Sequence, residues 1–73
     1  MVNNMQKIEH AYARTFSSES GAIVLEHLRR ITIERVLGPN ATDAELRTLE
    51  GMRSLVHQIE QLISRGRGDA ETT

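Results

Sequence analysis

The apolar residues of this sequence recur every three or four positions, which is the spacing of one face of an α-helix. The longest such stretch begins at Thr42, where Thr42 and Glu45 match the capping-box pattern of a helix start. Its apolar positions alternate steps of three and four: Leu46, Leu49, Met52, Val56, Ile59 and Ile63, with Leu55 and Leu62 widening the stripe. The pattern predicts a helix over residues 42–65 that stops at Gly66.

A second helix is predicted over residues 18–37. Ser17 or Ser18 can cap its start, because a serine hydroxyl accepts a hydrogen bond from the first helical turn. Gly38 suits a left-handed position after its end, and Pro39 cannot continue a helix. The positions expected to face the core are Val24, Leu25, Leu28, Ile31 and Leu37.

Residues 31–36 are the weak part of this second helix. β-branched and polar residues alternate there, which is the pattern of a strand. The helix is still favoured, because the sequence offers no second strand that could pair with this one.

A short first helix is predicted over residues 5–14, with Asn3 or Asn4 as its cap. The brief connection at 38–41 should fold the second and third helices into an antiparallel hairpin, with the first helix packed across it. The expected fold is therefore all-α, with one domain over residues 1–65 and a disordered tail over 66–73.

Two glycines inside the predicted helices call for a packing explanation. A helical glycine destabilises a helix by about 1 kcal/mol relative to alanine. We expect Gly51, and similarly Gly21, to let another helix approach closely.

The length, charge and lack of cysteine narrow the function. A chain of 73 residues lies near the lower limit for a stable single core, and without cysteine it can have neither disulfides nor thiolate metal sites. Association with another chain is then the expected source of stability. The nine basic and ten acidic residues nearly cancel, so no overall field attracts nucleic acid or a membrane. Without a signal or membrane-spanning segment, we expect a cytoplasmic protein.

No arrangement of residues predicts catalysis. His10, His27 and His57 fall on three different helices and have no second metal-ligating side chain at ligand spacing. Glycine-rich phosphate loops and nucleophile motifs are absent from the sequence. We therefore expect no enzyme activity, no catalytic residues, no metal and no cofactor.

A helix-turn-helix DNA-binding protein is an alternative, because a short glycine-containing turn precedes a helix bearing Arg47, Arg53, His57 and Gln58. Two features disfavour it. Both helices are long for this motif, and acidic residues interrupt any basic stripe that could face phosphates: Glu45, Glu50 and Glu60.

The favoured interpretation is a protein-binding helix face, since the third helix carries more apolar surface than a hairpin and a short first helix can bury. The residues expected to bury against a partner helix are Leu55, Val56, Ile59, Leu62 and Ile63. Arg53 and Arg65 are expected at the polar rim. We expect the partner to be a protein, either a second copy in a homo-oligomer or a different chain.

Several short blocks between residues 10 and 66 occur in a recognisable order: Tyr12 to Ser18, Gly21 with Val24-Leu25, Leu37 to Pro39, and Leu49 to Arg53 with Ile59. In this order they resemble the Bbp-nineteen-like family of small proteins encoded by tailed phages and prophages. The resemblance implies a phage or prophage origin and a part in virion assembly or DNA packaging, in the host cell or on the virion.

The two best-matching blocks are where contact with another protein is first expected. They are Arg14-Thr15-Phe16 and Leu49-Glu50-Gly51, so Arg14 and Phe16 join the expected partner-binding residues. The family offers no catalytic residues to carry over. A phage-encoded inhibitor of a host protein remains a further alternative, which differs from an assembly protein only in its partner.

Overall fold

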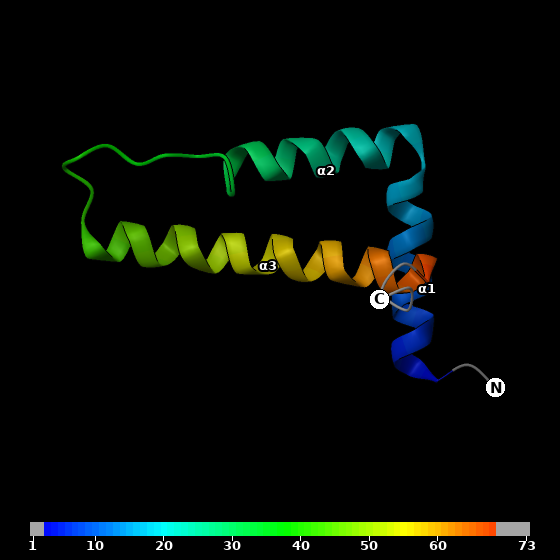
Figure 1. Cartoon of the computed structure of the whole chain (residues 1–73). Helices are drawn as coiled ribbons and strands as arrows, with labels where there is room; N and C mark the ends of the chain where they lie inside the picture. The colour runs from blue at the N-terminus through cyan, green and yellow to red at the C-terminus, as the bar shows by residue number, and fades with distance from the viewer. Residues whose placement is uncertain (1–2, 69–73) are drawn as a thin grey trace.

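The computed structural model describes residues 3–68, which form three helices: α1 (Asn4–Ser17), α2 (Glu19–Ile31) and α3 (Asp43–Arg67). α2 and α3 run antiparallel, joined by an extended loop, and α1 crosses the end of this hairpin where α2 begins and α3 finishes (Figure 1). No strand occurs among the described residues. The predicted all-α fold, with a helical hairpin and a first helix packed across it, is confirmed.

Each helix begins at a cap that the sequence predicted. The Asn3 side chain accepts a hydrogen bond from the Gln6 amide at 2.7 Å, and the Ser18 hydroxyl accepts one from the Gly21 amide at 3.0 Å. At α3 the capping box is complete: the Glu45 amide donates to the Thr42 hydroxyl at 3.1 Å, and the Thr42 amide donates to the Glu45 carboxylate at 3.3 Å. Because these caps involve residues three apart, local sequence was sufficient to place them.

α1 extends through Ser17, three residues beyond its predicted end at 14. The hydroxyl of Ser17 donates to the Ala13 carbonyl at 2.5 Å, so this serine bonds back into the helix instead of interrupting it. Ser18 then adopts an extended conformation and serves as the boundary of both α1 and α2. The two helices are consequently joined by a single residue.

α2 ends at Ile31, so the prediction of helix through residue 37 is wrong. Thr32 leaves the helical conformation, with φ −126° and ψ −72°, while its hydroxyl donates to the Leu28 carbonyl at 2.6 Å. The β-branched residues that follow favour extended backbone. Gly38 is not left-handed either, since the positive φ among the described residues belongs to Gly68.

α3 continues through Gly66 and Arg67, two residues beyond its predicted end. Gly68, at φ 82°, is the left-handed residue that terminates it, and its amide donates to the Arg65 carbonyl at 3.0 Å. Of the tail expected at 66–73, residues 66–68 thus form the helix end, and residues 69–73 lie outside the described part of the chain.

Two glycines make the helix contacts possible, and neither is Gly51. A Cβ on Gly66 would lie 2.1 Å from the Glu9 carbonyl oxygen, which places the backbone of α1 directly on α3. A Cβ on Gly21 would lie 2.0 Å from the Thr15 carbonyl oxygen, at the junction of α1 and α2. The close-packing prediction therefore agrees with the structure at Gly21. At Gly51 no other helix of the chain approaches, since no atom lies within 4 Å of its Cβ position.

The hydrophobic core is small. Its buried apolar residues are Ala13, Leu49, Val56 and Ile63. The last three repeat every seven residues along α3, so one seam of this helix forms most of the interior. Leu25 and Leu28 of α2 are half-buried, whereas Val24 and Ile31, which were expected to face the core, are exposed.

We expect Gly66→Ala to destabilise the fold by about 1–3 kcal/mol, because the added methyl group would displace the α1 backbone at Glu9. Urea unfolding at one fixed protein concentration measures the change. Gly38→Ala is the matched control: its Cβ meets no atom within 4 Å and its φ is not positive, so its stability should stay within about 1 kcal/mol of the wild type. Equal effects of the two substitutions would contradict the close contact at Gly66.

Candidate protein-binding surface

The hairpin carries exposed apolar side chains on one side. On α3, Arg53 and Glu60 face the α2 side, since Arg53 bonds the Thr32 carbonyl and Glu60 pairs with Arg29. The residues just before them, Met52 and Ile59, point about 100° away from this direction. Leu55 lies on the same stripe, three residues after Met52 and four before Ile59.

The corresponding stripe of α2 consists of Val24 and Ile31. The residues that follow them, Leu25 and Thr32, face α3: Leu25 shares a surface hollow with Ile63, and Thr32 is buried against Arg53. In two antiparallel helices that face each other, the residue just before each facing residue points toward the same side of the pair. Val24 and Ile31 therefore lie on the same side of the hairpin as the α3 stripe.

We call this surface the apolar face and define it by Val24, Ile31, Met52, Leu55 and Ile59. Leu55 is 57% exposed, Val24 50%, Ile31 43% and Met52 38%, whereas Ile59 is half-buried. Single exposed apolar residues are ordinary on a protein surface, but a group gathered on one side of a hairpin is typical of an interaction site.

α1 covers only one end of the apolar face. Gly66 lies seven residues after Ile59 on the same stripe of α3, and the α1 backbone at Glu9 rests on Gly66. Arg65 adds an ion pair here, with its guanidinium 3.8 Å from the Glu9 carboxylate. The stripe is thus covered where α3 ends and open toward Leu55 and Met52.

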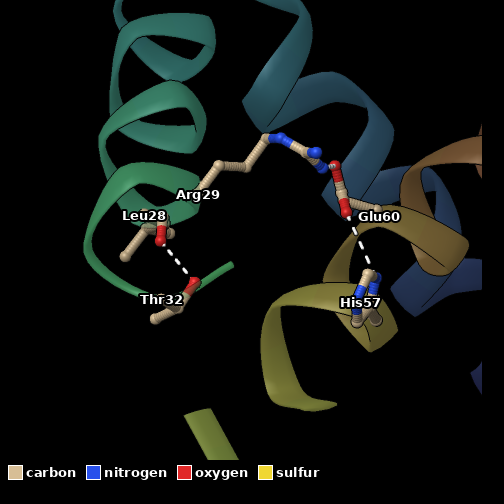
Figure 2. A network of polar contacts seen from close by, with 5 residues as sticks. All are labelled: Leu28, Arg29, Thr32, His57 and Glu60. Atoms are coloured by element: carbon tan, nitrogen blue, oxygen red, sulfur yellow. Dashed lines mark hydrogen bonds and ion pairs between the residues drawn. The ribbon is translucent and has the colours of Figure 1, made fainter. Parts of the chain in front are cut away.

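The opposite side of the hairpin is polar. Arg29 of α2 forms an ion pair with Glu60 of α3, and the Nδ1 atom of His57 lies 3.7 Å from the same carboxylate (Figure 2). Arg29 and Glu60 are partly exposed, so their ion pair contributes no more than about 1 kcal/mol to stability. This side of the hairpin thus carries the polar contacts between α2 and α3, together with the exposed Leu46 seven residues before Arg53, and the apolar face lies on the other side.

Arg53 holds the loop after α2. Its guanidinium donates to the Thr32 carbonyl at 2.9 Å, to the Arg35 carbonyl at 2.5 Å and to the Glu50 carboxylate at 2.7 Å. Two of these acceptors are loop carbonyls that lost their helical partners when α2 ended. Arg53 was predicted at the rim of a partner site, and in the structure its donors are directed toward the chain itself.

The residues predicted to bind a partner fall into three groups. Leu55 is exposed on the apolar face, with the half-buried Ile59 beside it. Val56 and Ile63 are interior residues, 3% and 4% exposed, and Leu62 is half-buried. The remaining predicted residues lie away from the open part of the face: Arg14, Phe16, Arg53 and Arg65.

The predicted residues on α1 have a different setting. Arg14 is exposed, whereas Phe16 is half-buried and stacks on Tyr12 with the ring centroids 6.3 Å apart. The structure therefore does not bring this block together with Leu55.

Sequence reasoning missed Val24, Ile31 and Met52 as surface residues. Val24 and Ile31 recur at helical spacing and were assigned to the core for that reason, whereas Met52 was placed in the apolar stripe of the third helix but was not chosen as a partner-binding residue. The alternation of β-branched and polar residues at 31–36 was the available signal that α2 ends early. Because the helix stops at Ile31, no following helical turn covers this residue.

No group of three metal-ligating side chains occurs within residues 3–68, and the three histidines lie on different helices. In the same part of the chain, no helix combines the length and apolar character needed to cross a membrane.

The fold and this surface define a small all-helical protein built around a hairpin with one open apolar side. The chain belongs to the Bbp19-like phage protein family, whose model matches residues 12–69 and so includes every residue of the apolar face. This is the family that the sequence blocks resemble. No curated protein and no solved structure matches the chain.

We expect Arg53→Ala to destabilise the protein by about 1–3 kcal/mol, because it leaves the Thr32 and Arg35 carbonyls without their donor. Urea unfolding measures the loss, and hydrogen exchange should show faster exchange of the Glu34 amide, which donates to the Arg29 carbonyl. Arg47→Ala changes an exposed arginine of the same helix and should alter stability by less than about 0.5 kcal/mol. Similar losses for both variants would argue against this role of Arg53.

Proposed function

We propose that this phage-family protein is a helical protein-binding module that acts in virion assembly or DNA packaging. The observation that carries the proposal is the open apolar face on one side of the hairpin. Membership of a phage protein family supports the setting, and the group of exposed apolar side chains on the face favours an apolar protein surface as its partner over phosphate groups.

Leu55 is the centre of the proposed contact. It is the most exposed residue of the face, and burying the rest of its side chain would contribute about 1–2 kcal/mol to binding. Val24, Ile31 and Met52 would add smaller areas around it. Arg65, which was predicted at the rim, pairs with Glu9 at the covered end of the face and takes no part in this contact.

A DNA-binding role finds less support. Arg53, one of the arginines that role would use, is bonded to loop carbonyls and to Glu50. Arg47 on the same helix is exposed but is followed by Glu50, which leaves no continuous basic stripe.

The test is affinity capture with the tagged full chain from cells carrying the induced phage, with the captured proteins identified by mass spectrometry. The wild type should capture phage structural or packaging proteins. Leu55→Asp should reduce this capture at least about 10-fold, because a carboxylate cannot be buried unpaired against an apolar surface.

Gln61→Asp is the matched control, since Gln61 is exposed on the same helix and off the apolar face. Circular dichroism should show that both variants keep the wild-type helix content. Equal capture by Leu55→Asp and the wild type would show that the face is not the binding surface. Capture of a host protein in place of phage proteins would refute the assembly role.

A further inference from the structure

The chain exposes more surface than a compact monomer of its size. An 8.2 kDa protein of ordinary compactness exposes about 4,500 Å², whereas this chain exposes 5760 Å². Its radius of gyration is 14.8 Å, against about 11 Å for a globular domain of this length. The excess of about 1,200 Å² per chain is comparable to the surface that one member of a large stable dimer buries.

Gly51 adds an observation that the monomer does not explain. It lies in the middle of α3, one turn before Leu55, and no atom lies within 4 Å of the position of a Cβ. Gly21 and Gly66, by contrast, each receive the backbone of another helix. Gly51 therefore weakens α3 by about 1 kcal/mol without any packing gain inside the chain.

We infer that the first occupant of the apolar face is a second copy of this chain, with the two α3 helices crossing antiparallel at Leu55. This rests on the proposed function, because it names the partner of the same face. In a two-fold arrangement the Leu55 side chains of the two copies meet near the axis. Residues equally far before and after Leu55 then lie at the same level, so Ile59 of one copy lies beside Gly51 of the other.

This pairing accounts for both observations. The absent side chain at Gly51 leaves room for the Ile59 side chain of the second copy, as small residues do where helices approach closely. The exposed area of Leu55 and Met52 is covered in both copies at once. The dimer would then bind phage proteins through its outer surfaces. Substitutions at Leu55 would reduce the capture of phage proteins because they dissociate the dimer.

A single introduced cysteine tests the arrangement, because the chain has none of its own. Leu55→Cys should form a disulfide-linked dimer under mild air oxidation, since its two copies meet at the axis. Gln61→Cys, exposed elsewhere on α3, should cross-link at least 10-fold more slowly. Sedimentation equilibrium of the wild type should show twice the chain mass at high concentration and dissociation on dilution.

A second pair of variants tests the close approach without threatening the fold. Gly51→Leu places a side chain where the monomer has open space, so it should keep the helix content but weaken dimerisation at least 10-fold. Ser54→Leu adds the same side chain at an exposed site away from the stripe and should leave dimerisation within about 2-fold of the wild type. Equal dimerisation by both variants would overturn the crossing at Leu55.

The outcomes separate this inference from the proposed function. A wild type that stays monomeric, with phage proteins still captured through Leu55, overturns the second copy and leaves the protein-binding role standing. A dimer linked through Leu55→Cys, with no phage protein captured, supports the inference and removes the assembly role. Equal cross-linking of Leu55→Cys and Gln61→Cys overturns the proposed axis.

Discussion

The contact of the α1 backbone with Gly66 of α3 is the constraint on which the rest of the structure depends. The Glu9 carbonyl and the Ala13 side chain lie where any other residue would place its Cβ, so α1 can approach α3 closely only at this glycine. Since α1 is joined to α2 through Ser18 alone, the position of α1 on α3 also fixes where α2 begins. A single close approach thereby sets the arrangement of all three helices.

The same contact determines which apolar surface remains open. α1 is 14 residues long and crosses the hairpin at one end, so it covers α3 near Gly66 and leaves the stripe toward Leu55 and Met52 uncovered. On the other side, Arg29 with Glu60 and Arg53 with the loop carbonyls hold the hairpin through polar contacts. Polar contacts therefore join α2 and α3 on one side of the hairpin, and the apolar face remains exposed on the other.

The sequence predicted features that depend on neighbouring residues and missed those that depend on distant ones. The caps at Asn3, Ser18 and Thr42 were predicted correctly because each acts within three residues. The end of α2 was predicted wrongly, because the Thr32 carbonyl accepts its hydrogen bond from Arg53, 21 residues away, and the local sequence does not show this contact. Gly66 resembled a helix end locally, and only the crossing of α1 explains why a glycine is needed inside the helix.

The surface was predictable to the same extent. The excess of apolar positions on α3 was visible in the sequence, and Leu55 was among the residues chosen. The sequence did not predict that Leu55 is exposed while the adjacent Val56 is buried, because both are apolar and the side of α3 that α2 covers is not known from the sequence. Val24 and Ile31 were assigned to the core on the same grounds, since periodicity identifies an apolar stripe without showing what packs on it.

Binding and stability are linked in a molecule of this design. With four buried apolar side chains among residues 3–68, the core contributes little, and any partner that covers the apolar face extends the same core across Leu55 and Met52. A partner that binds only the folded chain stabilises it in proportion to the logarithm of the partner's concentration. The unfolding midpoint should therefore rise with chain concentration if the occupant is a second copy, and stay constant if the occupant is another protein. The small core and the open apolar face thus have the same consequence: the hairpin needs a second apolar surface to pack against.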